Sequence, residues 1–214
     1  MSNNLEKMDS NLRQYFSSQK LLPILTVDDQ EVCEDLANLL CESGLHTFEV
    51  TLRTQVSLEV ISKMSSLGNF VVGAGTLISP SDVSSAIKAG AKFGVSPGIT
   101  PELLDECEKH SFPLIPGVST ASEIMNAYLR GFKILKLFPA DVLGGAKMLK
   151  ALAGPFPECE FFPTGGINQS NADQYLNLTN VIGVAGSWMV PRELIKERDW
   201  SKIRKIVKMS DWKI

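Results

Sequence analysis

The stretch SEIMNAYLRGFKILKLFPA, residues 122–140, contains the local pattern that decides the fold. Its first half, 122–131, is typical of a helix and ends in Gly131. Its second half, 132–140, is a short apolar run with the composition of a β-strand. A helix followed at once by a buried strand is the repeating unit of α/β proteins, in which parallel strands alternate with helices.

The same unit recurs along the rest of the chain. Gly90 ends a second helix-like segment, 81–90, directly before another strand candidate. Strand candidates lie at 21–27, 45–52, 70–77, 91–97, 112–118, 132–140, 160–166 and 180–188. Eight strands alternating with helices predict an α/β fold of the (β/α)₈ TIM-barrel type. A doubly wound open sheet is the competing fold, but it favours fewer strands and a glycine-rich fingerprint after the first one, which is absent here.

The chain shows no sign of a second domain. It has no low-complexity tract, block of like charges or linker, so we expect a single barrel domain over residues 1–214. Within it we expect an N-terminal helix in 1–20, a barrel core over 21–191 and a C-terminal helical segment in 192–214.

The composition limits the classes of function. The net charge of −3 gives no general attraction to nucleic acid or to an anionic membrane surface. No apolar run reaches the length of a membrane span, and the first residues lack the apolar core of a signal peptide. The four cysteines have no C-x-x-C spacing, and neither His46 nor His110 lies in a ligand-type cluster. We therefore expect a cytoplasmic protein with reduced thiols and no bound metal.

Lys136 stands in the middle of the apolar strand candidate 132–140. Side chains of a strand alternate between its two faces, so Ile134, Lys136 and Phe138 share one face. A buried ammonium is unfavourable unless it is paired or deprotonated. Two interpretations are therefore open: a lysine at a strand end that reaches water, or a buried amine whose lowered pKa makes it a nucleophile.

Polar side chains also lie within and directly after the strand candidate 45–52. Alternation places Glu49 and Arg53 on one face, and the apolar residues between them on the face that suits the helices. The carboxyl ends of barrel strands form the active site, so these side chains and Thr76, at the end of 70–77, should meet Lys136 there. A structural ion pair between Glu49 and Lys136 is one explanation. The other is a Schiff-base site, in which the free amine attacks a ketone and Glu49 transfers protons.

Glycine-rich ends on the last two strand candidates suggest an anion site. The motifs are TGG at 164–166 and GS at 186–187, where barrels often bind phosphate with backbone N–H groups. The same residues would also suit tight turns. Arg53 is a candidate bidentate partner for a carboxylate or a second phosphate contact, or else an ordinary surface arginine.

Eight ordered motifs resemble one known family, that of the 2-keto-3-deoxy-6-phosphogluconate (KDPG) aldolases, which also act as 4-hydroxy-2-oxoglutarate (KHG) aldolases. The motifs are EVTLRT (49–54), VGAGT (72–76), SPG (96–98), PLIPGVST (113–120), KLFPAD (136–141), AGPFP (153–157), PTGGI (163–167) and GSWMVP (186–191).

The resemblance implies a class I aldolase on a (β/α)₈ barrel, with an N-terminal helix closing the barrel bottom, a homotrimer and no cofactor or metal. Its substrate would be a small phosphorylated sugar acid, cleaved to pyruvate and glyceraldehyde 3-phosphate. The residues carried over by the resemblance are Lys136 as the Schiff-base lysine, Glu49 as the acid/base, Arg53 and Thr76 at the carboxylate end, Gly165, Gly166 and Ser187 at the phosphate, and Thr164 and Phe138 along the pocket.

Two other classes remain as alternatives. A sugar-phosphate isomerase or epimerase would use Glu49 as a base and Lys136 only as a stabilising charge. A non-catalytic barrel would bind a metabolite without turnover.

Overall fold

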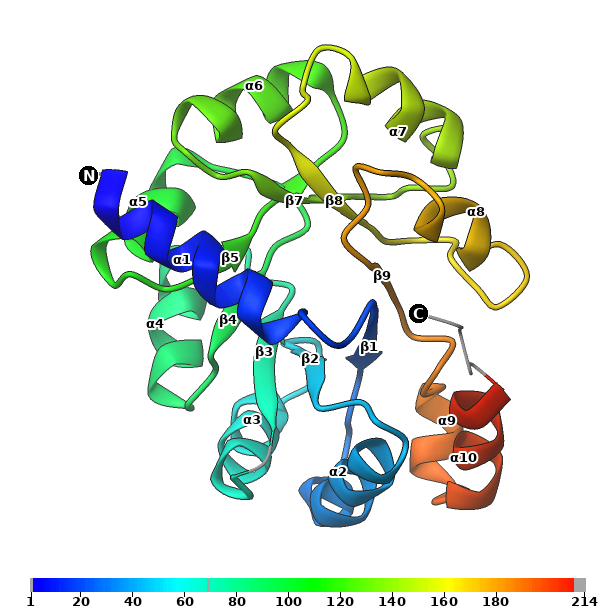
Figure 1. Cartoon of the computed structure of the whole chain (residues 1–214). Coiled ribbons are helices and arrows are strands. Elements are labelled where there is room, and N and C mark those ends of the chain that lie inside the picture. Colours follow the sequence, from blue (N-terminus) through cyan, green and yellow to red (C-terminus); the bar gives the residue numbers. More distant parts are fainter. Residues whose placement is uncertain (1, 69, 210–214) are drawn as a thin grey trace.

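Strands and helices alternate along the computed structural model, which describes residues 2–68 and 70–209 (Figure 1). Each of the predicted strand ranges contains an observed strand. The strands are β1 (Leu21–Leu25), β2 (Thr47–Thr51), β3 (Val71–Gly75), β4 (Phe93–Val95), β5 (Leu114–Ile115), β6 (Gly117–Val118), β7 (Ile134–Leu137), β8 (Glu160–Pro163) and β9 (Val184–Gly186).

Helices connect these strands. They are α1 (Ser2–Tyr15), the 3₁₀ helix η1 (Gln30–Val32), α2 (Cys33–Glu42), α3 (Ser57–Ser66), α4 (Pro80–Lys88), α5 (Pro101–Lys109), α6 (Ala121–Leu129), α7 (Gly145–Ala153), α8 (Ala172–Leu176), α9 (Arg192–Lys196) and α10 (Trp200–Met209). Helix α6 begins at a capping box, in which Thr120 accepts from Glu123 N–H and the Glu123 carboxylate accepts from Thr120 N–H. The predicted C-terminal helical segment contains α9 and α10, and its last residues, 210–214, lie outside the described part of the chain.

The strands form a curled parallel sheet with helices on its outer face (Figure 1). One part has the order β5-β4-β3-β2-β1-β9 and the other the order β6-β7-β8. Strands β5 and β6 together occupy the single predicted strand 112–118, which is interrupted at Pro116 because proline has no N–H for the ladder. The Pro116 carbonyl still accepts from Lys136 N–H at 2.9 Å. On the other side, parallel bridges pair Phe161 with Val181 and Thr164 with Ala185.

Two apolar clusters fill the faces of this sheet. The larger cluster lies between strands and helices and includes Phe48 and Val50 of β2. The smaller one lies on the concave face, where Leu12 and Phe16 pack with strand residues such as Ile134. The predicted alternation is thus confirmed: on β2 and β7 the outward residues are apolar, and the inward face carries the chemistry described next.

Candidate functional site

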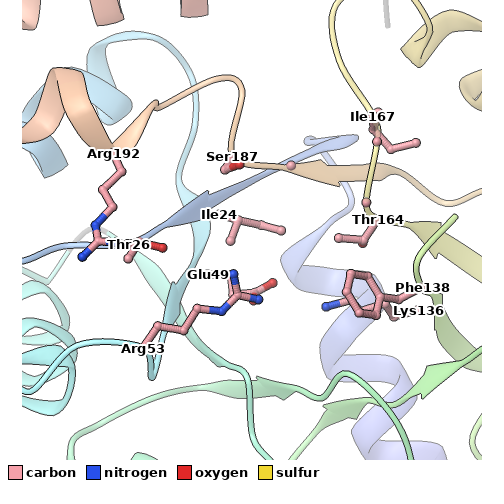
Figure 2. Close-up of a pocket in the computed structure, with 13 residues that line it drawn as sticks. Ile24, Thr26, Glu49, Arg53, Lys136, Phe138, Thr164, Ile167, Ser187 and Arg192 are labelled. Atoms are coloured by element: carbon pink, nitrogen blue, oxygen red, sulfur yellow. The ribbon is translucent and has the colours of Figure 1, made fainter. Parts of the chain in front are cut away.

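A cavity of about 380 Å³ opens where the strands end (Figure 2). It is lined by Ile24, Thr26, Glu49, Arg53, Lys136, Phe138, Thr164, Gly165, Gly166, Ile167, Gly186, Ser187 and Arg192. All of the site residues predicted from the sequence line this cavity except Thr76. Thr76 is hydrogen-bonded to Arg53, which does line the cavity. The structure therefore gathers into one pocket residues from strands that are distant in the sequence.

Lys136 is buried in β7, with 4% of its surface exposed, so it does not extend into water as a strand-end lysine would. Its Nζ atom lies 4.7 Å from the centroid of the Phe138 ring. Burial lowers the pKa of Lys136, the nearby Glu49 carboxylate partly offsets this effect, and Arg53 lowers the pKa further. A depressed pKa increases the fraction of free amine, which is the nucleophilic form.

Glu49 projects from β2 into the same pocket and is 1% exposed. Burial raises the pKa of Glu49, and the charges of Lys136 and Arg53 oppose the rise. The interaction with Lys136 acts through space, without a hydrogen bond between the two side chains. The Oε2 atom of Glu49 has no hydrogen-bond partner among the described residues. A buried carboxyl with a raised pKa and an oxygen available to a ligand suits proton transfer.

Gly75, at the end of the neighbouring strand β3, makes room for this carboxylate. A Cβ atom at position 75 would lie 1.8 Å from Glu49 Oε1 and 2.4 Å from its Cδ. The glycine of the predicted VGAGT motif is therefore required by the position of Glu49 and not by its own backbone conformation.

Thr76, which does not itself line the pocket, holds Arg53 at the pocket wall. The Arg53 Nε atom donates to Thr76 Oγ1 at 3.1 Å. Thr76 has φ 64°, a left-handed conformation that β-branched residues rarely adopt. Backbone strain of this kind is found at sites where a side chain must be aimed. Figure 2 shows the Arg53 guanidinium beside Glu49, so a carboxylate bound there would also be close to Lys136.

The glycines after β8 have left-handed backbone conformations. Gly165 and Gly166 have φ values of +92° and +78°, and a Cβ at position 166 would lie 2.3 Å from Asp141 Cβ. Within the described part of the chain, the N–H groups of Gly166 and Ser187 donate to no acceptor, whereas the parallel bridge between Thr164 and Ala185 directs the Gly165 N–H toward Ala185. Free backbone N–H groups beside glycines make a favourable site for phosphate. The anion site itself stays a prediction.

Four lining residues were not predicted: Ile24, Thr26, Ile167 and Arg192. Ile24 and Thr26 share a face of the first strand, so the alternation rule could have found them. Thr26 Oγ1 lies 3.0 Å from Thr51 Oγ1. Arg192 gave no local signal, because its partner Asp28 is 164 residues away in the sequence.

The two histidines lie in other contacts. His46 Nδ1 lies 3.6 Å from Cys41 Sγ, and His110 Nε2 lies 3.0 Å from Glu106 Oε1. Within residues 2–68 and 70–209, no group of three or more His, Cys, Asp or Glu side chains is arranged to hold a metal ion. Nor does any helix of these residues have the length and apolarity needed to cross a membrane.

A family model described as KDPG and KHG aldolase matches residues 12–206. This chain belongs to that family. A 2-dehydro-3-deoxy-phosphogluconate aldolase of Pseudomonas aeruginosa is 40% identical over 95% of this chain and 93% of its own length. A KHG/KDPG aldolase of Escherichia coli is 39% identical over 88% of this chain and 89% of its own.

Solved structures of the same family have the same fold. A KDPG aldolase from Legionella pneumophila superposes with a TM-score of 0.88 at 41% identity, covering 91% of this chain and 95% of that one. Its structure was determined with pyruvate captured at low pH as a covalent carbinolamine intermediate. A KDPG aldolase from Zymomonas mobilis gives a TM-score of 0.88 at 35% identity, covering 96% of each chain.

Proposed function

We propose that this family member is a class I aldolase that cleaves KDPG to pyruvate and glyceraldehyde 3-phosphate, and KHG to pyruvate and glyoxylate. The observation that carries the proposal is the buried amine of Lys136, whose lowered pKa and position beside Glu49 suit Schiff-base chemistry. The covalent carbinolamine in the Legionella relative supports it.

Lys136 would begin the reaction. The free amine attacks the C2 keto carbon to form a carbinolamine, which loses water to give an iminium ion. The iminium accepts the electron pair of the C3–C4 bond, so cleavage leaves the enamine of pyruvate on Lys136. Glu49 removes the C4 hydroxyl proton, directly or through water, as the aldehyde forms. Protonation of C3 and hydrolysis then release pyruvate and restore the amine.

The remaining roles follow from the polarity of the pocket. Arg53, aimed by Thr76, would bind the carboxylate next to the keto group. The backbone at Gly165 and the N–H groups of Gly166 and Ser187 would bind the phosphate. Two further lining residues, Thr164 and Phe138, would shape the pocket between these ends.

The isomerase alternative has no support from the matched family or from the relatives described above, all of which are named aldolases. A non-catalytic barrel would have no need of a buried lysine and glutamate in one pocket, since the burial of two ionisable groups destabilises the fold.

Borohydride reduction with pyruvate tests the proposal directly. We expect an adduct on Lys136 by peptide mass mapping, and pyruvate release from KDPG in a coupled assay. Lys136→Arg keeps the positive charge but removes the nucleophile, so turnover should be lost almost completely. An isomerase would keep appreciable activity in this variant, and absence of an adduct on Lys136 would exclude the imine mechanism.

The proposal includes a closed (β/α)₈ barrel in a single domain, residues 1–214, with α1 across its bottom. The shared strand of β5 and β6, and the bridges between 161 and 181 and between 164 and 185, support closure on both sides. The packing of Leu12 and Phe16 against concave-face residues supports the position of α1. Hydrogen exchange should find β8 and β9, the end strands of the two sheet parts, protected as strongly as β3, because a closed barrel has no edge strand.

A homotrimer in the cytoplasm completes the proposal. Exposed apolar side chains on two parts of the surface support self-association: Leu129 on α6, 79% exposed, and Ile78 after β3, 67% exposed. A cyclic trimer joins two different surfaces of each protomer. Light scattering should give three times the chain mass, and Leu129→Asp should lower it. The four cysteines are free thiols, which agrees with a reducing compartment.

A further inference from the structure

We propose that Arg192 binds the phosphate at the far end of the substrate and so sets the preference for a phosphorylated over an unphosphorylated sugar acid. The inference rests on the proposed aldolase function and concerns a residue that neither the sequence pattern nor the proposed mechanism uses.

Arg192 shares the pocket with the predicted phosphate site. It lines the same cavity as Gly165, Gly166 and Ser187. Figure 2 shows its side chain extending from the start of α9 toward Thr26, on the opposite side of the pocket from Lys136. A substrate joined to Lys136 through C2 would therefore extend its other end toward this side of the pocket.

The hydrogen bonds of Arg192 leave part of its guanidinium available. Nε donates to Asp28 Oδ2 at 2.8 Å and Nη2 donates to Asp28 Oδ1 at 2.5 Å. A guanidinium has five N–H groups in a fixed plane, so this bidentate pair uses one edge. Nη1 makes no hydrogen bond to a described residue. Asp28 thus holds the side chain at the rim, and the unused N–H groups can bind an anion.

The charges around Arg192 are balanced. Asp28 also lies 3.8 Å from Lys196 Nζ, and Glu193 lies 3.8 Å from the same Nζ, so two cations face two carboxylates and the anion would be bound by the unused N–H groups of Arg192. The other arginine of the pocket, Arg53, lies beside Glu49 and is fixed by Thr76. Two arginines at separate places in one pocket match a substrate that carries a carboxylate at one end and a phosphate at the other.

A second ion pair provides a matched control. Arg198 Nη2 donates to Asp29 Oδ2 at 2.9 Å, and Arg198 does not line the pocket. Both arginines are about half exposed, so each pair contributes little to stability and both variants should fold. Arg192→Gln and Arg198→Gln therefore remove the same charge from similar surroundings, inside and outside the pocket.

The test is steady-state cleavage of KDPG and of its unphosphorylated analogue, 2-keto-3-deoxygluconate, followed by pyruvate release. We expect Arg192→Gln to raise KM for KDPG about tenfold, the size of one lost hydrogen bond to a charged group, with kcat within about twofold. KM for the unphosphorylated analogue should not change. Inorganic phosphate should inhibit the wild type more strongly than Arg192→Gln, and Arg192→Lys, which keeps the charge, should recover part of the loss.

An unchanged KM for KDPG in Arg192→Gln, or an equal change for both substrates, would overturn the inference. An equal effect of Arg198→Gln would do the same, since it would show that surface charge alone is responsible. Failure of the aldolase proposal itself would be seen separately, because the wild type would then release no pyruvate and form no borohydride adduct with it.

Discussion

Replacing Gly75 with alanine should displace the Glu49 carboxylate and slow turnover while leaving the Lys136 amine reactive. The new Cβ would lie 1.8 Å from Glu49 Oε1, and ordinary van der Waals contact begins near 3.4 Å, so the carboxylate must move by about 1.6 Å. A displacement of about 1 Å in a catalytic group can reduce the rate roughly 100-fold. Complete loss of general acid–base catalysis costs about 10²- to 10⁴-fold. We therefore expect kcat for KDPG cleavage to fall at least about 100-fold.

Two measurements separate this effect from unfolding. Borohydride trapping of pyruvate should still label Lys136 in Gly75→Ala, because the amine is on β7 and the substitution is on β3. Overpacking of this kind destabilises a fold by about 1 to 3 kcal/mol, so the thermal transition should shift down but remain cooperative.

The matched control is Gly98→Ala. A Cβ at Gly98 meets nothing within 4 Å, its φ lies outside the left-handed range and it does not line the pocket, so its kinetics should equal those of the wild type. Glu49→Gln should reproduce the kcat defect of Gly75→Ala. A Gly75→Ala enzyme that folds and turns over at the wild-type rate would refute the placement of Glu49 as the proton-transfer group.

Three further predictions concern ionisation. Arg53 lowers the pKa of Lys136, so Arg53→Met should move the acidic limb of the borohydride trapping rate to higher pH; a limb that stays in place would contradict the electrostatic coupling. Burial disfavours the charged forms of both Lys136 and Glu49 at neutral pH, so the double variant Lys136→Met/Glu49→Gln should unfold at a higher temperature than the wild type at pH 7, by calorimetry. Burial raises the pKa of Asp9 on α1 from 3.8 to about 6, so the stability it contributes is fully present below pH 3.8 and is lost as the pH rises through about 6. Asp9→Asn should therefore raise the melting temperature at pH 8 relative to the wild type more than at pH 4, and equal shifts at both pH values would count against this assignment.

The sequence alone placed most of this pocket because strand geometry is periodic. A period of two puts Glu49 and Arg53 on one face of β2 and Lys136 on the matching face of β7, whatever the details of packing. Parallel strands bring their carboxyl ends to one side, so these faces had to meet. The length of α1 was less predictable: it ends at Tyr15, although the apolar pattern continues to Phe16, because helix ends depend on local capping contacts.

The parts that could not be predicted depend on single long-range contacts. The contact between Arg53 and Thr76 requires a left-handed threonine, which no local pattern indicates. The pairing of Arg192 with Asp28 joins residues 164 positions apart, and an arginine after a proline would be assigned to the surface from the sequence. The sequence shows the proline at position 116 but does not show that it interrupts the strand, because the residues on either side of it still pair with neighbouring strands.

The apolar cluster on the concave face connects α1 with the lining of the pocket. Ile24 belongs both to this cluster and to the pocket lining, and Phe162 pairs in register with Lys136. Leu12 and Phe16 therefore keep the concave face apolar around the neighbours of Lys136, and an apolar surrounding has a low dielectric constant. We expect a polar group there, as in Leu12→Asn, to admit water and to return the pKa of Lys136 toward its ordinary value, so a substitution on α1 would alter an ionisation on β7.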